Sequence, residues 1–158
     1  MKYAFPVLLI VVIFAALFAG CSTSSTQAAP GDVQDTVFRN SVANSSGMIR
    51  LSLNQIGKDF SGSDIEALNR SGIRLGEQAT GDYKKISIIP VSDSWKLTKD
   101  YYLESLLEME NASALIGLGV EAFSQGDYPS AQEYFNQSGR SIEKGTAYVT
   151  MTIQSMPQ

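Results

Sequence analysis

The 158-residue sequence contains no histidine and a single cysteine, Cys21. These absences exclude a histidine general base, Ser-His and Cys-His nucleophile pairs, histidine-ligated metal sites and an intramolecular disulfide. Basic residues are also in the minority, with 12 Lys and Arg against 16 Asp and Glu. An acidic balance disfavours nucleic acid as a partner. We therefore expect no metal, no cofactor and no nucleic-acid ligand.

The N-terminal segment has the features of an export signal. Lys2 supplies a positive charge, and the stretch from Ala4 to Ala19 is apolar and interrupted only by Pro6. A charged start, an apolar stretch and small residues before a cleavage point are typical of a secretory signal peptide. We predict a signal peptide over residues 1–20, whose removal leaves 138 residues, since 158 − 20 = 138.

The residues around this cleavage point carry a family resemblance. Phe18-Ala19-Gly20-Cys21 resembles the lipobox of prokaryotic lipoproteins, in which Leu is preferred where Phe18 stands. The resemblance implies that Cys21 receives a diacylglyceryl thioether, becomes the mature N-terminus and anchors the protein to the extracytoplasmic face of the cell membrane. Residues 22–31 are small, polar and uncharged. We therefore expect residues 21–31 to form a flexible tether between the lipidated cysteine and a folded domain.

Two other fates of the segment remain open. The 17 residues from Ala4 to Gly20 are at the lower limit for spanning a bilayer, so they are also compatible with an uncleaved transmembrane anchor. A soluble secreted form is the third alternative. In all three the folded part lies outside the cytoplasm, with Lys2 on the inside.

Strand signals are nearly absent after the tether, and apolar residues recur there with alternating spacings of three and four. This spacing is typical of long helices packed nearly side by side. Glycine and proline turn signals divide the pattern into four predicted helices, over residues 33–60, 63–89, 94–125 and 128–156. We therefore predict an all-α domain over residues 32–158, an up-down four-helix bundle of two long antiparallel helical hairpins.

Individual residues of this pattern carry further predictions. Ser63 and Glu66 have the spacing of a capping box at the start of the second helix. Asp82 interrupts the apolar stripe of that helix, and Tyr83 is expected to take its place in the core. Small residues on the stripes are expected to let the helices approach closely, at Ser46, Gly72, Ser113, Ser138 and Gly145.

Residues 111–144 resemble one tetratricopeptide repeat, a helix–turn–helix unit of about 34 residues. The resemblance rests on Leu118-Gly119 in the first helix, Gly126-Asp127-Tyr128-Pro129 at the turn and Ala131 in the second helix. The C-terminal half is therefore described as TPR-like. The family implies peptide binding in a concave groove, but a single unit builds no groove. We favour similar hairpin packing over a degenerate repeat protein.

Candidate interaction sites lie at the two ends of the predicted bundle. Its topology brings the tether, the loop near Pro90 and the C-terminus to one end. Lysine and tryptophan suit an anionic lipid surface, so we predict membrane-proximal contacts there through Lys84, Lys85, Trp95, Lys96 and Lys99. The opposite end is expected to be acidic and to face a protein partner, through Asp59, Asp64, Glu66, Glu121, Asp127 and Glu133.

Carboxylates and asparagines are the remaining candidates for chemistry. Glu104 and Glu108 share one face of the third helix, but a carboxylate pair acts in a cleft that a thin bundle lacks. No catalytic site is predicted. Four asparagines stand in Asn-x-Ser sequons and are candidate glycosylation sites, namely Asn44, Asn69, Asn111 and Asn136.

These features predict a non-catalytic, lipid-anchored scaffold or protein-interaction module outside the cytoplasm. Membrane lipid is one expected partner, through acylated Cys21, and a protein of unknown identity is the other. The alternative is a ligand-binding sensor or accessory subunit with a pocket between the helices. A cavity lined by Tyr83, Tyr102 and Met109 would favour this alternative, and a filled core would count against it.

Overall fold

The computed structural model describes residues 30–157, with side chains from Asp32 onward. Its elements are α1 (Pro30–Ser61), α2 (Ile65–Ser87), the short 3-10 helix η3 (Asp93–Trp95), α3 (Lys96–Ser124) and α4 (Tyr128–Gln154). No strand occurs between residues 30 and 157, and the predicted all-α class is confirmed. The predicted signal peptide, the lipobox with Cys21 and most of the predicted tether lie outside the described residues.

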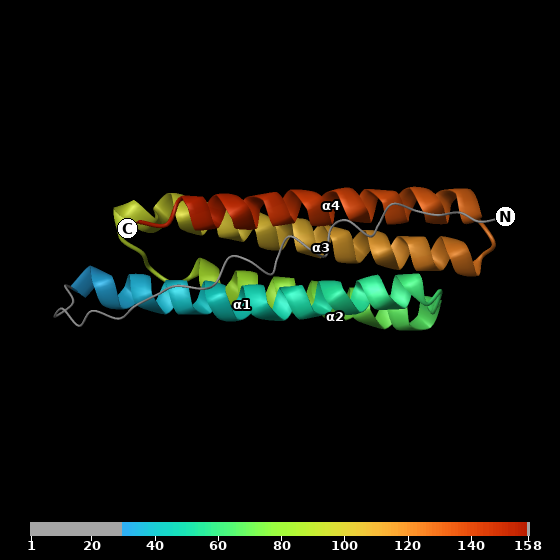
Figure 1. Cartoon of the computed structure of the whole chain (residues 1–158), viewed down its shortest axis with the longest axis horizontal. Coiled ribbons are helices and arrows are strands. Elements are labelled where there is room, and N and C mark those ends of the chain that lie inside the picture. The colour runs from blue at the N-terminus through green and yellow to red at the C-terminus, as the bar shows by residue number, and fades with distance from the viewer. Residues whose placement is uncertain (1–29, 158) are drawn as a thin grey trace.

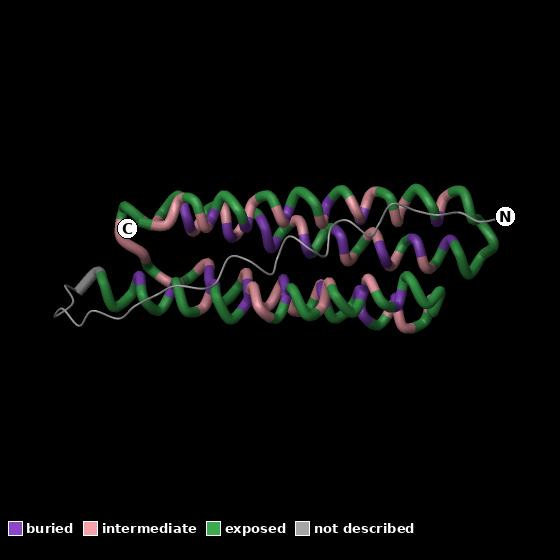
Figure 2. The backbone as a smooth tube through the Cα atoms, viewed as in Figure 1, coloured by how far each residue is buried: buried purple, intermediate pink, exposed green. Residues whose placement is uncertain are grey.

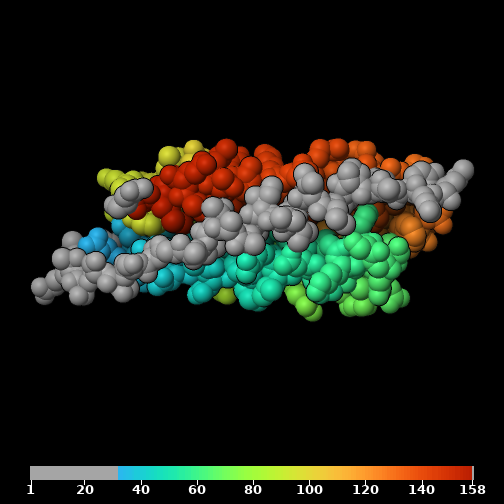
Figure 3. Space-filling model, viewed as in Figure 1, coloured from blue at the N-terminus to red at the C-terminus, as the bar shows by residue number. Residues whose placement is uncertain are grey.

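The four long helices form an up-down bundle of two antiparallel hairpins, as predicted (Figure 1). The most extensive backbone contacts join neighbours in the chain: α1 with α2, α2 with α3, and α3 with α4. The start of α1, residues 88–95 and the end of α4 lie together at what we call the proximal end. The turns at residues 62–64 and 125–127 lie at the distal end, where the α3–α4 hairpin extends past the α1–α2 hairpin (Figures 1 and 3).

The first distal turn differs from the predicted capping box. Ser63 has φ 56°, a left-handed conformation that closes the turn before the helix begins. The cap is therefore the next residue, Asp64, whose Oδ1 accepts a hydrogen bond from the Ala67 amide at 2.8 Å. The capping-box prediction for Ser63 and Glu66 is wrong, because the helix starts one residue later than the pattern indicated.

The second distal turn follows its prediction. Gly126 adopts φ 79°, which glycine tolerates at little cost. Asp127 caps α4 by accepting a hydrogen bond from the Ser130 amide at 3.2 Å, and Pro129 stands in the first turn. Hydrogen bonds from the Ser130 side chain and from the Ser130 backbone amide both lower the pKa of Asp127, and the side-chain bond has the larger effect.

One hydrophobic core runs the length of the bundle and draws on all four helices (Figure 2). Burying each large apolar side chain contributes about 1.5–3 kcal/mol relative to leaving it in water. The largest buried apolar side chains are Phe38, Leu68, Leu75, Ile86, Tyr102, Leu106 and Met109. They fall on the stripes of three and four spacing that predicted the helices.

Small residues let the helices approach closely, as expected. A Cβ atom added to Gly145 of α4 would lie 2.7 Å from Met109 Cε and 3.2 Å from the Ser105 carbonyl oxygen of α3. In the same seam, Ser138 Oγ donates to the Ala112 carbonyl oxygen at 3.0 Å. A larger side chain at either position would therefore push α3 and α4 apart.

The hairpin with the tetratricopeptide resemblance is longer than a single repeat. α3 has 29 residues and α4 has 27, and both are unbroken. A tetratricopeptide repeat fits a whole helix pair into about 34 residues. The resemblance therefore covers only the distal part of a long hairpin.

Candidate functional site

Three aspartates lie buried along the seam of the α1–α2 hairpin, although sequence patterns placed none of them in the core. Each accepts a hydrogen bond from a serine hydroxyl on the facing segment: Asp35 from Ser92 at 2.6 Å, Asp59 from Ser71 at 2.5 Å, and Asp82 from Ser45 at 2.5 Å. Within residues 32–157 none of the three aspartates forms an ion pair. Neutral donors therefore balance these carboxylates.

Asp82 corrects a sequence prediction. Its side chain is buried on the core side of α2, and Tyr83 is only partly buried. The predicted exchange of the two residues is wrong, because Ser45 and Gln78 satisfy the carboxylate where it stands. Gln78 Nε2 donates to Asp82 at 2.6 Å from one turn earlier in the same helix.

A sequence signal for two of these aspartates exists. Gln55 stands four residues before Asp59 and donates to it at 2.7 Å, just as Gln78 stands four residues before Asp82. Residues four apart share a helix face, so a glutamine at this spacing is positioned to satisfy a buried carboxylate. Asp35 lacks such a partner and is bonded instead by the Ser92 backbone amide at 2.9 Å.

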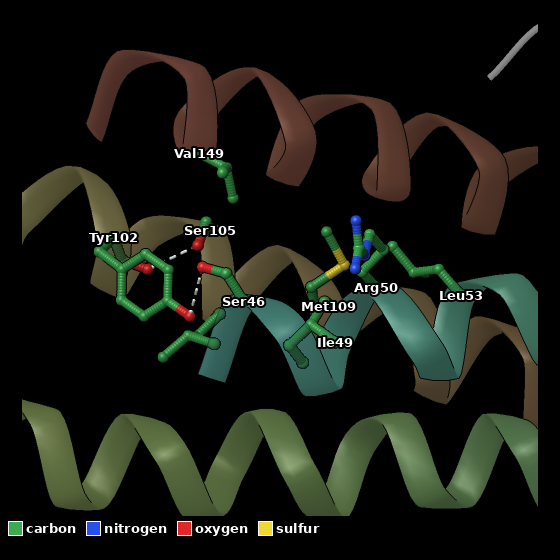
Figure 4. A pocket seen from close by; sticks show the side chains of 9 residues that line it. Ser46, Ile49, Arg50, Leu53, Tyr102, Ser105, Met109 and Val149 are labelled. Atoms are coloured by element: carbon green, nitrogen blue, oxygen red, sulfur yellow. Dashed lines mark hydrogen bonds between the residues drawn. The ribbon is translucent and has the colours of Figure 1, made fainter. Parts of the chain in front are cut away.

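Tyr102 of α3 lies buried where the two hairpins meet. Its hydroxyl accepts a hydrogen bond from Ser46 Oγ of α1 at 3.2 Å (Figure 4). Burial raises the pKa of Tyr102 to about 12, helped by the nearby Asp82 charge and opposed by its hydrogen bonds with Ser45 and Ser46. The hydroxyl therefore stays neutral over the physiological range and serves as a structural contact between the hairpins.

A small cavity adjoins Tyr102 between α1, α3 and α4. Its lining is almost wholly apolar and includes Ile49, Met109 and Val149 (Figure 4). Its volume is about 10 Å³. This is about the space of a single water, and an apolar lining offers a water few partners. The cavity therefore has no room for an organic ligand, and Tyr83 does not line it.

The residues predicted to contact lipid are all at the proximal end, but several have internal partners. Lys99 Nζ donates to the carbonyl oxygens of Ser87 at 2.7 Å and Ile89 at 2.6 Å, and so caps the end of α2. Lys96 forms an ion pair with Asp93 at 2.6 Å. The pairing raises the pKa of Lys96 and lowers that of Asp93, mainly through their hydrogen bond and secondarily through the attraction of the two charges. These two lysines are thus already engaged within the fold.

Trp95 packs on the core, with its ring 5.9 Å from Phe38 in an edge-to-face arrangement. Lys84 and Lys85 lie exposed in the last turn of α2 and form no ion pair within residues 32–157. Ile88 follows them and is 80% exposed. Of the residues predicted to contact lipid, Lys84 and Lys85 are therefore the exposed ones that form no ion pair within residues 32–157. Sequence reasoning did not predict the exposed Ile88 that follows them.

The distal end combines exposed aromatic rings with acidic side chains. Phe123 and Tyr128 meet edge to face at 5.3 Å, and Phe60 meets Phe135 at 5.6 Å. Phe135 lies against Gly119, one turn from Phe123, so the two pairs are neighbours. Tyr128 is 61% exposed. We call Phe60, Phe123, Tyr128 and Phe135 the distal aromatic cluster.

Only part of the predicted acidic surface is free at this end. Asp59 is buried, and Asp64 caps α2. Glu66 pairs with Arg70 at 3.7 Å, and Glu133 pairs with Arg140 at 3.2 Å. Gln137, and then Arg140, lower the pKa of Glu133 by hydrogen bonding. The exposed side chains at the distal end are therefore aromatic as well as acidic.

The two glutamates that share a face of α3 both lie near one lysine. Glu108 pairs with Lys144 of α4, and its hydrogen bond and charge are the main causes that raise the pKa of Lys144, with a smaller contribution from the charge of the exposed Glu104. No group of three or more metal-ligating side chains occurs among residues 32–157.

The four sequon asparagines all lie within helices. Asn44 and Asn136 are exposed and Asn69 is half-buried. Asn111 Nδ2 donates to Ser141 Oγ of α4 at 2.8 Å and so joins two helices. A glycan on Asn111 would have to break that contact.

The fold thus defines the class of protein as an all-helical, two-hairpin bundle. None of the helices between residues 30 and 157 is long and apolar enough to cross a membrane. Comparison of the chain with protein-family models, curated proteins and solved structures gives no match.

Proposed function

We propose that the protein is a non-catalytic helical interaction module, held on the extracytoplasmic face of a prokaryotic cell membrane by lipidated Cys21. The lipobox resemblance supports the anchor. The observation that supports the interaction role is the separation of the two ends of the bundle. α1 begins at Pro30, nine residues after Cys21, at the proximal end, whereas the distal aromatic cluster lies at the other end.

The length of α1 sets the distance between the proximal and distal ends. With 32 residues and a rise of about 1.5 Å per residue, α1 spans roughly 48 Å. Aromatic side chains that remain partly exposed are typical of protein-recognition surfaces. In this proposal the bundle holds the distal aromatic cluster away from the lipid, toward a protein partner.

The ligand-binding alternative has less support. Its expected pocket would be lined by Tyr83, Tyr102 and Met109, and the cavity there includes the last two but not Tyr83. A volume of about 10 Å³ excludes anything larger than water in this conformation.

Mass spectrometry of the mature N-terminus tests the anchor. We expect the chain to begin at Cys21 with a diacylglyceryl group, and to fractionate with membranes. A Cys21→Ser variant is the matched control, and should remain an unprocessed precursor. A native chain that kept residues 1–20, or that lacked lipid and was released, would overturn the lipid anchor.

Site-specific photo-crosslinking tests the interaction role in the anchored protein. A photoreactive residue at Tyr128 should give a discrete protein adduct. The same residue at Met151, which is exposed at the proximal end of α4, is the control and should not give that adduct. Equal labelling from both positions, or none from Tyr128, would contradict a distal partner site.

A further inference from the structure

The distal aromatic cluster presents ring surface that the bundle does not cover. Tyr128 at the start of α4 is 61% exposed, and Phe123 at the end of α3, which meets it edge to face, is 39% exposed. The face of an aromatic ring carries partial negative charge. The chemistry of a partner that covers these rings therefore depends on the charge around them.

The net charge of the bundle differs between its two ends. At the distal end, residues 57–70 and 121–140 contain six acidic and three basic residues, a net charge of −3. At the proximal end, residues 32–40, 82–102 and 148–157 contain five acidic and five basic residues, a net charge of zero. The distal aromatic cluster therefore lies at the end of the bundle that carries an excess of negative charge.

The last turn of α3 places part of this negative charge beside Phe123. The carbonyl groups at the C-terminus of a helix are partly negative, so a cation is favourable there. The last turns of α1 and α2 contain lysine, but the last turn of α3 contains no basic residue. It contains Glu121 instead, which accepts a hydrogen bond from Gln125 at 3.3 Å and forms no ion pair within residues 32–157. The negative end of α3 is therefore not balanced by a cation of the bundle.

Asp127 adds a second carboxylate directly before Tyr128. Its Oδ1 accepts the hydrogen bond from the Ser130 amide that caps α4. The hydrogen bonds from Ser130 lower the pKa of Asp127, so this carboxylate is charged at neutral pH. Like Glu121, it forms no ion pair among residues 32–157. Two unpaired carboxylates thus accompany the exposed pair of Phe123 and Tyr128.

We propose that the distal aromatic cluster docks a basic segment of the protein partner, with an arginine on the exposed ring of Tyr128 and its charge balanced by Glu121 and Asp127. This inference rests on the proposed function and specifies the chemistry of the partner. Arginine suits the surface because its planar guanidinium both stacks on an aromatic face and donates hydrogen bonds to carboxylates. Lysine offers a point charge without that plane.

Charge disfavours other occupants of the distal aromatic cluster. An anionic lipid headgroup or a nucleic acid would meet the net charge of −3 at this end. A second copy would bring an equal charge of −3 with its own distal end. A basic protein segment gains from both the carboxylates and the rings.

Binding of labelled peptides to the mature full-length chain in phosphatidylcholine vesicles tests the proposal. These vesicles have no net charge, so the peptide meets an excess of charge only on the protein. Fluorescence anisotropy compares a peptide of three Arg-Gly repeats with the same peptide carrying citrulline, which keeps the planar group but has no charge. The citrulline peptide should bind about five-fold more weakly or not at all. Equal binding of both peptides, or no binding of the arginine peptide, would overturn the proposal.

Charge-neutralising variants locate the peptide on the surface. Glu121→Gln with Asp127→Asn should weaken binding of the arginine peptide about five-fold, and asparagine preserves the helix cap. Glu110→Gln with Glu143→Gln is the matched control, because it removes two exposed carboxylates from the middle of the bundle that form no ion pair within residues 32–157. It should change binding less than about two-fold. Equal weakening by both pairs would indicate a general attraction to an acidic protein and would overturn the proposal.

Photo-crosslinking distinguishes a failure of this inference from a failure of the proposed function. A photoreactive phenylalanine derivative in place of Tyr128 keeps an aromatic ring at that position. In the anchored protein, Glu121→Gln with Asp127→Asn should lower the yield of the partner adduct about five-fold. An adduct of unchanged yield would support the distal partner site but overturn the basic partner. The absence of any adduct would overturn the distal partner site and this inference with it.

Discussion

The α1–α2 hairpin is joined across its seam by buried carboxylates and serine hydroxyls, whereas the α3–α4 hairpin is joined by close backbone approach. Asp59 and Asp82 accept from serines of the facing helix in the first hairpin. In the second, Gly145 lies against Met109 and the backbone of Ser105. Two helical hairpins with similar apolar stripes are therefore held together in different ways. The first depends on hydrogen-bonded polar pairs, and the second depends on residues small enough for the helices to approach closely.

The largest expected effect comes from adding volume to the tight seam. Gly145→Val should lower the free energy of unfolding by about 3 kcal/mol, because even a Cβ atom there meets Met109 and the Ser105 backbone. Gly57→Val in α1 is the matched control, since its Cβ would meet nothing within 4 Å. It should be neutral or slightly stabilising. Urea denaturation of both variants measures the contrast, and equal losses would show that the seams do not differ in this way.

The next effect concerns the contact between the hairpins and depends on pH. The pKa of Tyr102 is about 12 in the folded protein, against about 10 for an exposed tyrosine. Between these values the unfolded chain loses the proton and the folded chain keeps it, so stability falls as pH rises. The titration of Tyr102 should therefore lower the free energy of unfolding by about 2–3 kcal/mol between pH 10 and pH 12.

Tyr102→Phe removes this titration, and its unfolding free energy should fall less steeply than the native value between pH 10 and pH 12. At pH 7 the variant should lose only about 1 kcal/mol, for the hydrogen bond with Ser46. Denaturant curves at several pH values measure both quantities. Parallel pH profiles would show that Tyr102 does not titrate as its burial requires.

A third effect tests the polar seam. Asp82→Ala should cost about 2 kcal/mol, because Ser45 and Gln78 lose their acceptor in a buried place. Asp82→Ala combined with Ser45→Ala should cost less than the sum of the two single changes, since the double variant removes the serine donor and the carboxylate together. A double-mutant cycle measured by chemical denaturation gives the coupling. Strictly additive losses of unfolding free energy would mean that the hydrogen bond between Ser45 and Asp82 does not stabilise the contact between α1 and α2.

The smallest effect distinguishes the two distal turns. Ser63→Gly should stabilise the protein by a few tenths of a kcal/mol up to about 1, because it relieves a left-handed serine. Gly126→Ser should cost about 1 kcal/mol for the opposite reason. Thermal melts followed by circular dichroism check the signs. Two changes of the same sign would contradict the backbone argument.

The sequence predicted the helices well because their stripes are long and regular. The four ranges agree with the structure to within three residues at each end. The errors fall where local chemistry overrides the pattern. The pattern predicts a cap at Ser63 because a left-handed conformation leaves no periodic signal in the sequence. It predicts Asp82 outside the core because hydropathy alone does not register the side chains that donate to this carboxylate.

The candidate surfaces were predicted less completely than the fold. Lys84 and Lys85 are exposed as expected, but Lys99 caps α2, a role that depends on a loop geometry absent from any periodicity. The exposed apolar residues on the outer face of α1, such as Val33 and Leu51, were not predicted. A helix with two apolar stripes can be assigned its inward one only when its neighbours are known.

The proximal end gathers the beginning and the end of the folded chain. A fluorescent reporter fused to the C-terminus therefore samples the same surroundings as the start of α1, and does not report on events at the opposite end of the bundle. A probe for that pole has to be inserted into a turn. Gly126 and its neighbours are exposed and join α3 to α4 outside both helices, so they suit such an insertion.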